Sequence, residues 1–231
     1  MSLSRRSEFL AGMLDIVPVV AAALPVGMLF GVIAVQKGLT PIEVTAMSTL
    51  VFAGAAQFVA LELWREPVPI LLVTFSAFIV NLRHVMMGAS LGRHMRLFSP
   101  ANRAASAFVM VDEVWAFAER RALKGPLTPA YYWGMGATLW LQWVAGGTIG
   151  AFAGRSLGDP ARFGFDFAFT ALFIVILTGF WRGSRTGAVL AAAAVVSALV
   201  KLYVPGAWNI AAGGLAGVAV AALYPVEEEV R

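Results

Sequence analysis

Polar residues interrupt a long apolar stretch at Asn81-Leu82-Arg83-His84. Residues 70–80 before this segment are almost wholly apolar, and residues 85–91 after it are nearly so. An arginine inside the hydrocarbon of a bilayer costs about 2.5 kcal/mol or more unless its side chain faces protein or water. The pattern therefore predicts a polar, substrate-binding site inside a membrane protein, with a snorkelling arginine at a helix end as the alternative. The candidate substrate-binding residues of this segment are Asn81, Arg83 and His84.

A second polar interruption is the carboxyl pair Asp112-Glu113, which has five mostly apolar residues on each side. Successive residues of a helix are rotated by about 100°, so the two carboxyls cannot share one face. We therefore expect one to face a cavity and the other to pair with an arginine such as Arg83. Asp112 and Glu113 are the candidates for carrying a coupling proton or binding a substrate ammonium. A structural ion pair beside one protonated acid is the alternative.

A third candidate lies in the small-residue segment Phe52-Ala53-Gly54-Ala55-Ala56-Gln57-Phe58. Gly54 permits a local break that would free backbone groups for a ligand, as in the discontinuous helices of transporters. Gln57 would then add a side-chain hydrogen bond to the same ligand. Close helix packing, with Gln57 bonded to a neighbouring helix, explains the segment equally well.

The elements that must position these residues are transmembrane helices. Apolar residues make up 60% of the 231 residues and charged residues only 13%, and a spanning helix needs about 20 mostly apolar residues. The chain has no cysteine, and its net charge of +4 is not gathered into a basic tract, which argues against disulfides and nucleic-acid binding. We expect an all-α, polytopic membrane protein of about seven or eight spans, with broken helices. The expected spans are residues 14–35, 41–64, 67–92, 101–123, 131–154, 165–181, 186–204 and 208–224.

We expect a single membrane domain over residues 1–231, with flexible ends at residues 1–13 and 225–231. An internal repeat is also possible, although the residues concerned are common here and chance could produce the match. Repeats of this kind are typical of secondary transporters, which bind substrate between them. In the possible repeat, Gly27, Gly31, Ala34 and Pro41 align with Gly146, Gly150, Ala153 and Pro160.

Taken together, several segments resemble the AzlC family, the large subunits of bacterial branched-chain amino-acid exporters. The resemblance covers most of the chain, from about Gly12 to Leu177, and implies export of hydrophobic amino acids from the cytoplasm. It also implies a multi-pass protein of the bacterial cytoplasmic membrane that works with a small membrane subunit of the AzlD type. The segments are Leu24-Pro25-Val26-Gly27 with Phe30-Gly31, Ser48, residues 52–58, residues 81–84, Gly88-Ala89-Ser90-Leu91 and Asp112-Glu113.

The residues themselves favour a secondary transporter over an enzyme. Arg83 or the start of a half-helix suits the carboxylate of an amino acid, and the chain has no phosphate-binding loop of its own for ATP. We expect coupling to a proton or amino-acid gradient, with no cofactor or metal. An intramembrane enzyme using His84 with Asp112 or Glu113 is a second hypothesis, and a channel or non-transporting subunit is a third.

Overall fold

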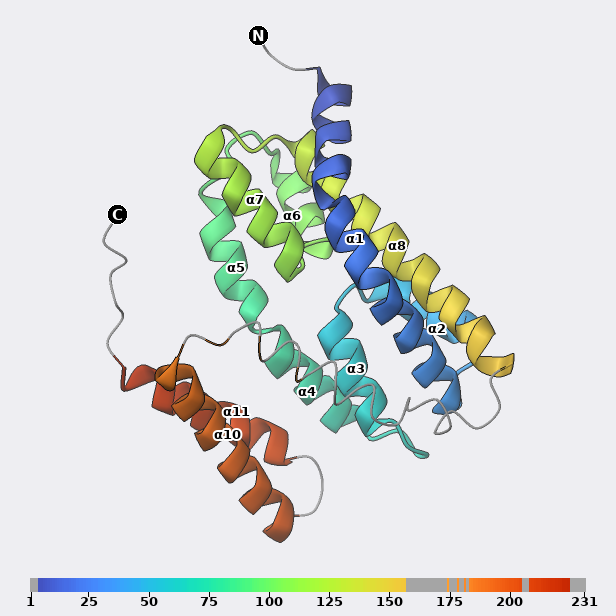
Figure 1. The fold of residues 1–231 in the computed structure, drawn as a ribbon, viewed down its shortest axis with the longest axis vertical. Coiled ribbons are helices and arrows are strands. Elements are labelled where there is room, and N and C mark those ends of the chain that lie inside the picture. Colours follow the sequence, from blue (N-terminus) through green and yellow to red (C-terminus); the bar gives the residue numbers. More distant parts are fainter. Residues whose placement is uncertain are drawn as a thin grey trace.

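The computed structural model describes residues 4–156, 183–204 and 208–224, together with residues 174, 178 and 181. This part of the chain is helical and contains no strand, so the predicted all-α class is confirmed. Its two longest helices lie together along one side of the molecule (Figure 1). The described helices are α1 (Arg5–Gln36), α2 (Pro41–Leu50), α3 (Gly54–Leu63), α4 (Ile70–Asn81), α5 (Arg83–Gly92), α6 (Pro100–Phe108), α7 (Asp112–Lys124), α8 (Pro129–Ser156), α10 (Ser184–Tyr203) and α11 (Trp208–Ala222).

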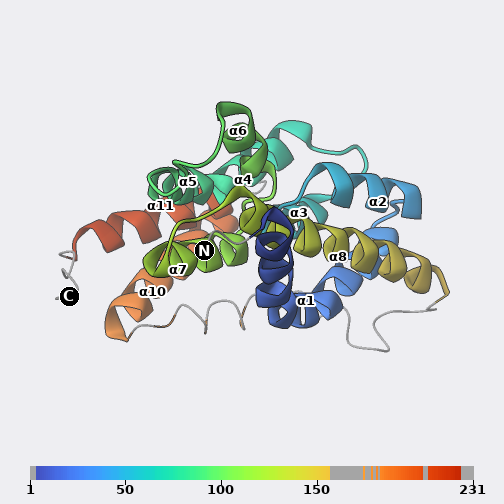
Figure 2. The same cartoon turned by 90° about the horizontal axis from the view of Figure 1, so that it is seen from above.

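The two longest helices are α1 and α8, which lie side by side and run in the same direction (Figures 1 and 2). Glycines let the two backbones approach closely. A Cβ atom on Gly12 would lie 2.1 Å from the carbonyl oxygen of Tyr131, and one on Gly134 would lie 2.2 Å from that of Phe9. Such distances leave no room for a side chain. The packing of α1 on α8 therefore depends on small residues, as is typical of membrane helices.

The glycines of the possible repeat meet each other in this pair. A Cβ atom on Gly31 would lie 2.0 Å from the carbonyl oxygen of Gly147, and one on Gly150 would lie 2.0 Å from that of Met28. In the aligned repeat Gly31 corresponds to Gly150 and Met28 to Gly147. The two contacts are thus reciprocal, as expected of two parallel helices related by a local two-fold axis. The contacts of Gly12 with Tyr131 and of Gly134 with Phe9 are reciprocal at a different offset, so reciprocity follows from the parallel packing and the repeat stays a prediction.

Two of the expected spans are broken in the middle. The helix that begins at Pro41, where Thr40 and Glu43 form a capping box, ends at Leu50, and α3 begins at Gly54. A break, which Gly54 permits, is present over residues 51–53, directly before Gly54.

The expected span over residues 101–123 is also divided, into α6 and α7, with residues 109–111 outside both helices. The expectation of one continuous helix here is wrong. Asp112 and Glu113 lie in the first turn of α7, where the positive end of the helix dipole stabilises carboxylates.

The expected span over residues 67–92 corresponds to α4 and α5, which are almost continuous. The single residue between them, Leu82, keeps helical backbone angles (φ −55°, ψ −28°). By length and composition, the described helices that could each cross a membrane are α1, α10 and the combined helix Ile70–Gly92. The expected span over residues 165–181 and the expected flexible end at residues 225–231 lie outside the described residues, apart from positions 174, 178 and 181.

The start of the chain needs a correction. A flexible segment over residues 1–13 is predicted from the sequence, yet α1 begins at Arg5 and its first turns are fixed by packing. The buried carboxylate of Glu8 accepts hydrogen bonds from Arg121 Nη2 at 3.0 Å and Thr128 Oγ1 at 2.8 Å. Glu8 thereby ties the start of α1 to the end of α7 and the start of α8.

The helices α10 and α11 form a hairpin that contacts the rest of the molecule through α4 (Figure 1). Phe75 of α4 lies against Trp208 of α11, with ring centroids 6.1 Å apart. Within the hairpin, Gly213 lies against α10: a Cβ atom there would be 2.9 Å from the carbonyl oxygen of Ala193. The small residues of these two helices therefore pack largely on each other.

Candidate functional site

The structure brings Arg83 and Asp112 together across the start of α5 and the start of α7. Arg83 Nη1 lies 2.7 Å from Asp112 Oδ2, and each side chain is roughly one-third to two-fifths exposed in the isolated chain (35% and 41%). The predicted pairing of one carboxyl with Arg83 is therefore seen, and Asp112 is the partner. Glu113, the next residue, is exposed on a different side of α7, as the 100° rotation between neighbours requires.

Three polar atoms on Arg83 or on residues within three positions of Arg83 or Asp112 in the chain are buried without a hydrogen-bond partner. They are Asn81 Oδ1, Arg83 Nε and Trp115 Nε1. Buried polar atoms in proteins are usually paired, so this group can bind a further polar ligand or water. His84 contacts the backbone, with Nδ1 3.1 Å from the carbonyl oxygen of Asn81. In the hypothesis of an enzyme, His84 acts with Asp112 or Glu113; in the described residues Asp112 pairs with Arg83, and Glu113 is exposed on another side of α7.

The second predicted site, around Gly54 and Gln57, lies against α8. Gln57 is fully buried, and its Oε1 accepts a hydrogen bond of 2.8 Å from Trp143 Nε1. The indole ring also lies against the first turn of α3: a Cβ atom on Gly54 would be 2.9 Å from Trp143 Cη2. The helix-packing interpretation is seen, because Gln57 bonds a neighbouring helix. Ligand binding by Gln57 stays a prediction, and its Nε2 is left without a partner.

Two further polar residues, Ser48 and Gln142, are not among the site residues predicted from the sequence. Ser48 Oγ and both amide atoms of Gln142 are buried without hydrogen-bond partners. Ser48 lies beside Gly147, one turn after Trp143 on α8. A Cβ atom added to Gly147 would lie 3.0 Å from Ser48 Oγ. The sequence could have indicated both residues, because the amide of Gln142 and the hydroxyl of Ser48 lie inside apolar spans.

Both helix breaks converge on the middle of α8. Trp140 Nε1 donates to the carbonyl oxygen of Thr49, which the end of α2 leaves free, at 3.2 Å. The ring of Trp140 also packs against Phe108 at the end of α6, with centroids 6.4 Å apart. Beside it, a Cβ atom on Gly136 would lie 2.6 Å from Val109. The two broken spans are thus held against the same stretch of one helix.

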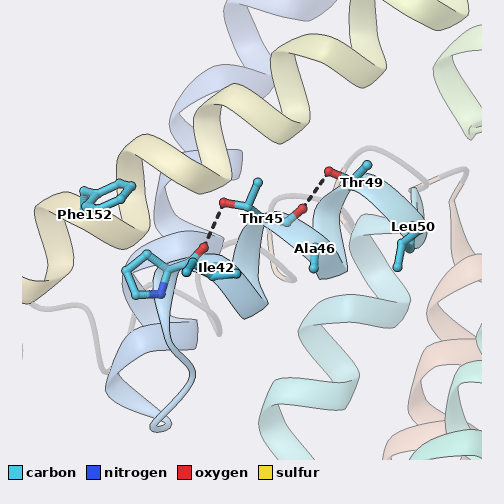
Figure 3. Close-up of a pocket in the computed structure, with 7 residues that line it drawn as sticks. Ile42, Thr45, Ala46, Thr49, Leu50 and Phe152 are labelled. Atoms are coloured by element: carbon cyan, nitrogen blue, oxygen red, sulfur yellow. Dashed lines mark hydrogen bonds between the residues drawn. The ribbon is translucent and has the colours of Figure 1, made fainter.

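An open hollow of about 430 Å³ lies on the outer side of α2 (Figure 3). Its hydroxyls are already engaged, because Thr45 Oγ1 donates to the carbonyl oxygen of Pro41 and Thr49 Oγ1 to that of Thr45. The remaining side chains are apolar and include Phe152 of α8. The hollow contains none of the predicted site residues and offers no charge for an amino acid. Among the described residues, no group of three or more His, Asp or Glu side chains could hold a metal ion.

Broken helices that place buried polar groups beside one long helix are typical of helical membrane transport proteins. The sequence model of the AzlC protein family matches residues 18–157, more than half of the chain, and the chain belongs to this family.

Its relatives are membrane proteins. The chain is 30% identical to the inner membrane protein YgaZ of Escherichia coli K12, over 85% of this chain and 83% of that protein. It is 31% identical to an uncharacterized membrane protein of Archaeoglobus fulgidus, over 94% and 95% of the two chains. It is 28% identical to the branched-chain amino acid transport protein AzlC of Bacillus subtilis, over 73% of this chain and 66% of that protein. No solved structure matches the chain.

Proposed function

We propose that this protein is a secondary transporter that exports branched-chain or other hydrophobic amino acids across the bacterial cytoplasmic membrane. The substrate class is supported by the name of the Bacillus subtilis relative, a branched-chain amino acid transport protein. The location is supported by the Escherichia coli relative, an inner membrane protein. The buried polar groups beside two broken helices suit a small polar ligand with an apolar side chain.

The observation that carries the proposal is the ion pair between Arg83 and Asp112. Its two charges lie at the starts of different helices, α5 and α7, so a change in the pair can move one helix relative to the other. A proton on Asp112 would cancel its charge and weaken its hold on Arg83. Asp112 is therefore the residue that we assign to the coupling proton, and Arg83 is the counter-ion that holds α5 and α7 together between proton transfers.

The energy for export comes from a gradient in this proposal. The sequence contains no phosphate-binding loop of the G-x-x-x-x-G-K-[ST] type. We further propose that the chain acts as the large subunit of a two-component exporter with a small AzlD-type membrane protein.

The experiment is amino-acid efflux from bacterial cells that lack their own branched-chain exporters. Cells expressing the protein, alone or with its small partner, are loaded with leucine, isoleucine or valine, and the external amino acid is followed over time. Expression should accelerate efflux, and a protonophore should abolish the acceleration. Efflux equal to that of cells carrying an empty vector, at confirmed membrane abundance, would contradict the proposal.

A further inference from the structure

We propose that the carboxylate of the transported amino acid binds at the first turn of α3, where Gln57, Ser48 and Gln142 supply neutral hydrogen-bond donors. Trp143 is the positioning residue of this site. The inference rests on the proposed amino-acid transport function and assigns one part of the substrate to one place in the fold. It also replaces Arg83 as the group that receives the carboxylate, because Arg83 is already paired with Asp112.

The first step is the orientation of the Gln57 amide. An indole N–H can only donate a hydrogen bond, so the group facing it must be the amide oxygen. Trp143 Nε1 lies 2.8 Å from Gln57 Oε1, and this bond turns the NH₂ group of Gln57 away from the indole. Gln57 is fully buried and its Nε2 has no partner. The bond with Trp143 thus presents two unused donors in the protein interior.

The second step is the helix start beside that amide. The first backbone hydrogen bond at this end of α3 runs from Gln57 N to the carbonyl oxygen of Ala53, and no side chain caps the helix. The N–H groups of the first turn are therefore available, and the helix dipole favours an anion there. Gln57 lies one turn into α3, and helical side chains tilt toward the start of their helix. Its amide therefore reaches along the first turn.

The third step is the set of neighbouring polar atoms. Ser48 Oγ and Gln142 Nε2 also lack hydrogen-bond partners, and both residues are at least nine-tenths buried. Gln142 precedes Trp143 on α8, and Ser48 of α2 lies beside Gly147, one turn after Trp143. Glycines surround them: Cβ atoms on Gly27 and Gly146 would lie 3.5 Å and 3.4 Å from Gln142 Nε2. Ser48 and Gln142 thus lie beside glycines of α1 and α8.

The chemistry of the donors selects the ligand group. Gln57 offers only N–H donors once its oxygen is engaged, Ser48 can donate, and the start of α3 donates through its backbone. Gln142 can donate through Nε2, and its Oε1 is an unpartnered acceptor. A set of donors without a fixed positive charge suits an anion that must later be released, because an ion pair would bind it more tightly. A carboxylate, which accepts several hydrogen bonds at once, fits this set better than an ammonium.

The experiment compares binding of leucine with binding of leucinamide, which keeps the ammonium and side chain but lacks the carboxylate. The full chain is purified with any membrane partner that it retains, and affinities are measured by equilibrium dialysis with labelled leucine and competition by leucinamide. The wild type should prefer leucine by about tenfold or more, since hydrogen bonds to a charged group are worth about that much. Gln57→Met, which keeps the volume and removes the amide, should reduce this preference to within about threefold.

The positioning role of Trp143 has its own readout. Trp143→Phe keeps the ring and removes the N–H, so the Gln57 amide is free to turn. It should weaken leucine binding about tenfold in the wild-type background and change it less than about twofold in the Gln57→Met background. A Trp143 that only packs would have the same effect in both backgrounds.

Controls separate this inference from the proposed function. Gln36→Met makes the same change at an exposed glutamine at the end of α1 and should leave the preference for leucine unchanged.

Ser48→Ala removes one hydroxyl and replaces Gln57→Met as the test if Gln57→Met does not elute as a folded protein. Ser48→Ala should weaken leucine binding about threefold or more and leave leucinamide binding unaffected. A full leucine preference in the folded Gln57→Met variant, or in Ser48→Ala where Gln57→Met does not fold, would overturn the carboxylate site and leave the exporter standing. Equal binding of leucine and leucinamide by the wild type would also overturn the carboxylate site and leave the exporter proposal standing. A wild type that binds neither would overturn both.

Discussion

Arg83 Nη1 and Asp112 Oδ2 lie 2.7 Å apart, although Arg83 is at the start of α5 and Asp112 at the start of α7. The two helices run parallel, since Ser90, two turns after Arg83, donates a hydrogen bond to Glu119, two turns after Asp112. His94 extends the same contact, with Nε2 3.4 Å from Glu119 Oε2. The ion pair therefore lies at one end of the contact between α5 and α7, and the contacts of Ser90 and His94 with Glu119 lie at the other end.

Replacing Arg83 should abolish export. Arg83→Ala removes the only charge that contacts Asp112 in the described part of the chain, and efflux should fall about tenfold or more. Arg83→Lys should restore little, because an ammonium lacks the planar guanidinium that also carries the buried Nε. Efflux and membrane abundance are measured together, and full efflux by Arg83→Ala at normal abundance would remove Arg83 from the mechanism.

The double variant Arg83→Ala/Asp112→Ala distinguishes a structural pair from a functional one. Removing one member leaves an uncompensated charge, whereas removing both does not. The double variant should therefore be more stable than either single variant in a thermal-unfolding assay and still transport no amino acid. Recovery of efflux together with stability would show that the pair only supports the fold.

The two neighbouring carboxyls should behave differently. Asp112 pairs with Arg83 while Glu113 is exposed on another side of α7. Asp112→Asn should therefore lose proton-coupled efflux, and Glu113→Gln should stay within about twofold of the wild type, since it removes no contact of the ion pair. The measurement is initial efflux rate under an imposed pH gradient. Equal rates for the two variants would contradict the assignment of the coupling proton to Asp112.

The crossing of α1 and α8 should not tolerate a methyl group at its glycines. Gly31→Ala and Gly150→Ala each place a Cβ atom about 2.0 Å from a carbonyl oxygen of the other helix. Overpacking of this kind costs about 1–3 kcal/mol of stability, so both variants should unfold at lower temperature in mild detergent. Gly214→Ala is the matched control, because nothing lies within 4 Å of its Cβ position. A control that is destabilised as much as the other two would refute the close approach.

The start of α1 should contribute to stability through Glu8. Glu8→Ala leaves Arg121 without its carboxylate partner and Thr128 without its acceptor, which should cost about 1–3 kcal/mol. Glu66→Ala, a change at an exposed glutamate, should be neutral. Thermal unfolding of the two variants checks this directly. Equal unfolding temperatures of the two variants would show that the Glu8 contacts do not stabilise the start of α1, as expected of the flexible end that the sequence predicts.

The polar interruptions could be found from the sequence because a polar side chain in an apolar span is costly wherever it lies. This reasoning located Arg83, Asp112 and Gln57, and it placed a break at Gly54, where glycine permits one. The break at residues 109–111 was missed, since the residues there are Val109, Met110 and Val111 and carry no glycine or proline signal.

The role of Gln142 and Trp143 depends on the fold and could not be predicted from the sequence. Each is one polar group in an apolar helix, which is equally consistent with packing against another helix. Only the position of α3 shows that Trp143 bonds Gln57 and that Gln142 is left without a partner. Contacts between α8 and α3 span many residues of sequence, and no local pattern encodes them.

The small membrane partner needs a contact surface on this chain. Gly213 and Gly217 are covered by α10, so these small residues are used within the chain. No residue of α10 is buried. On the side of α10 away from α11, Val195, Leu199 and Leu202 form an exposed apolar stripe.

Lipid can cover such a stripe, and so can another membrane helix, because apolar surface alone does not distinguish them. We expect an AzlD-type protein to co-purify with the chain in mild detergent. Replacing Val195 and Leu199 with Trp should release the partner without unfolding the chain, whereas Leu141→Trp, on the exposed side of α8, should not. Proteoliposomes containing the chain alone should show little leucine flux, and addition of the partner should restore it. Robust flux from the chain alone would refute the two-component proposal and leave the transporter assignment intact.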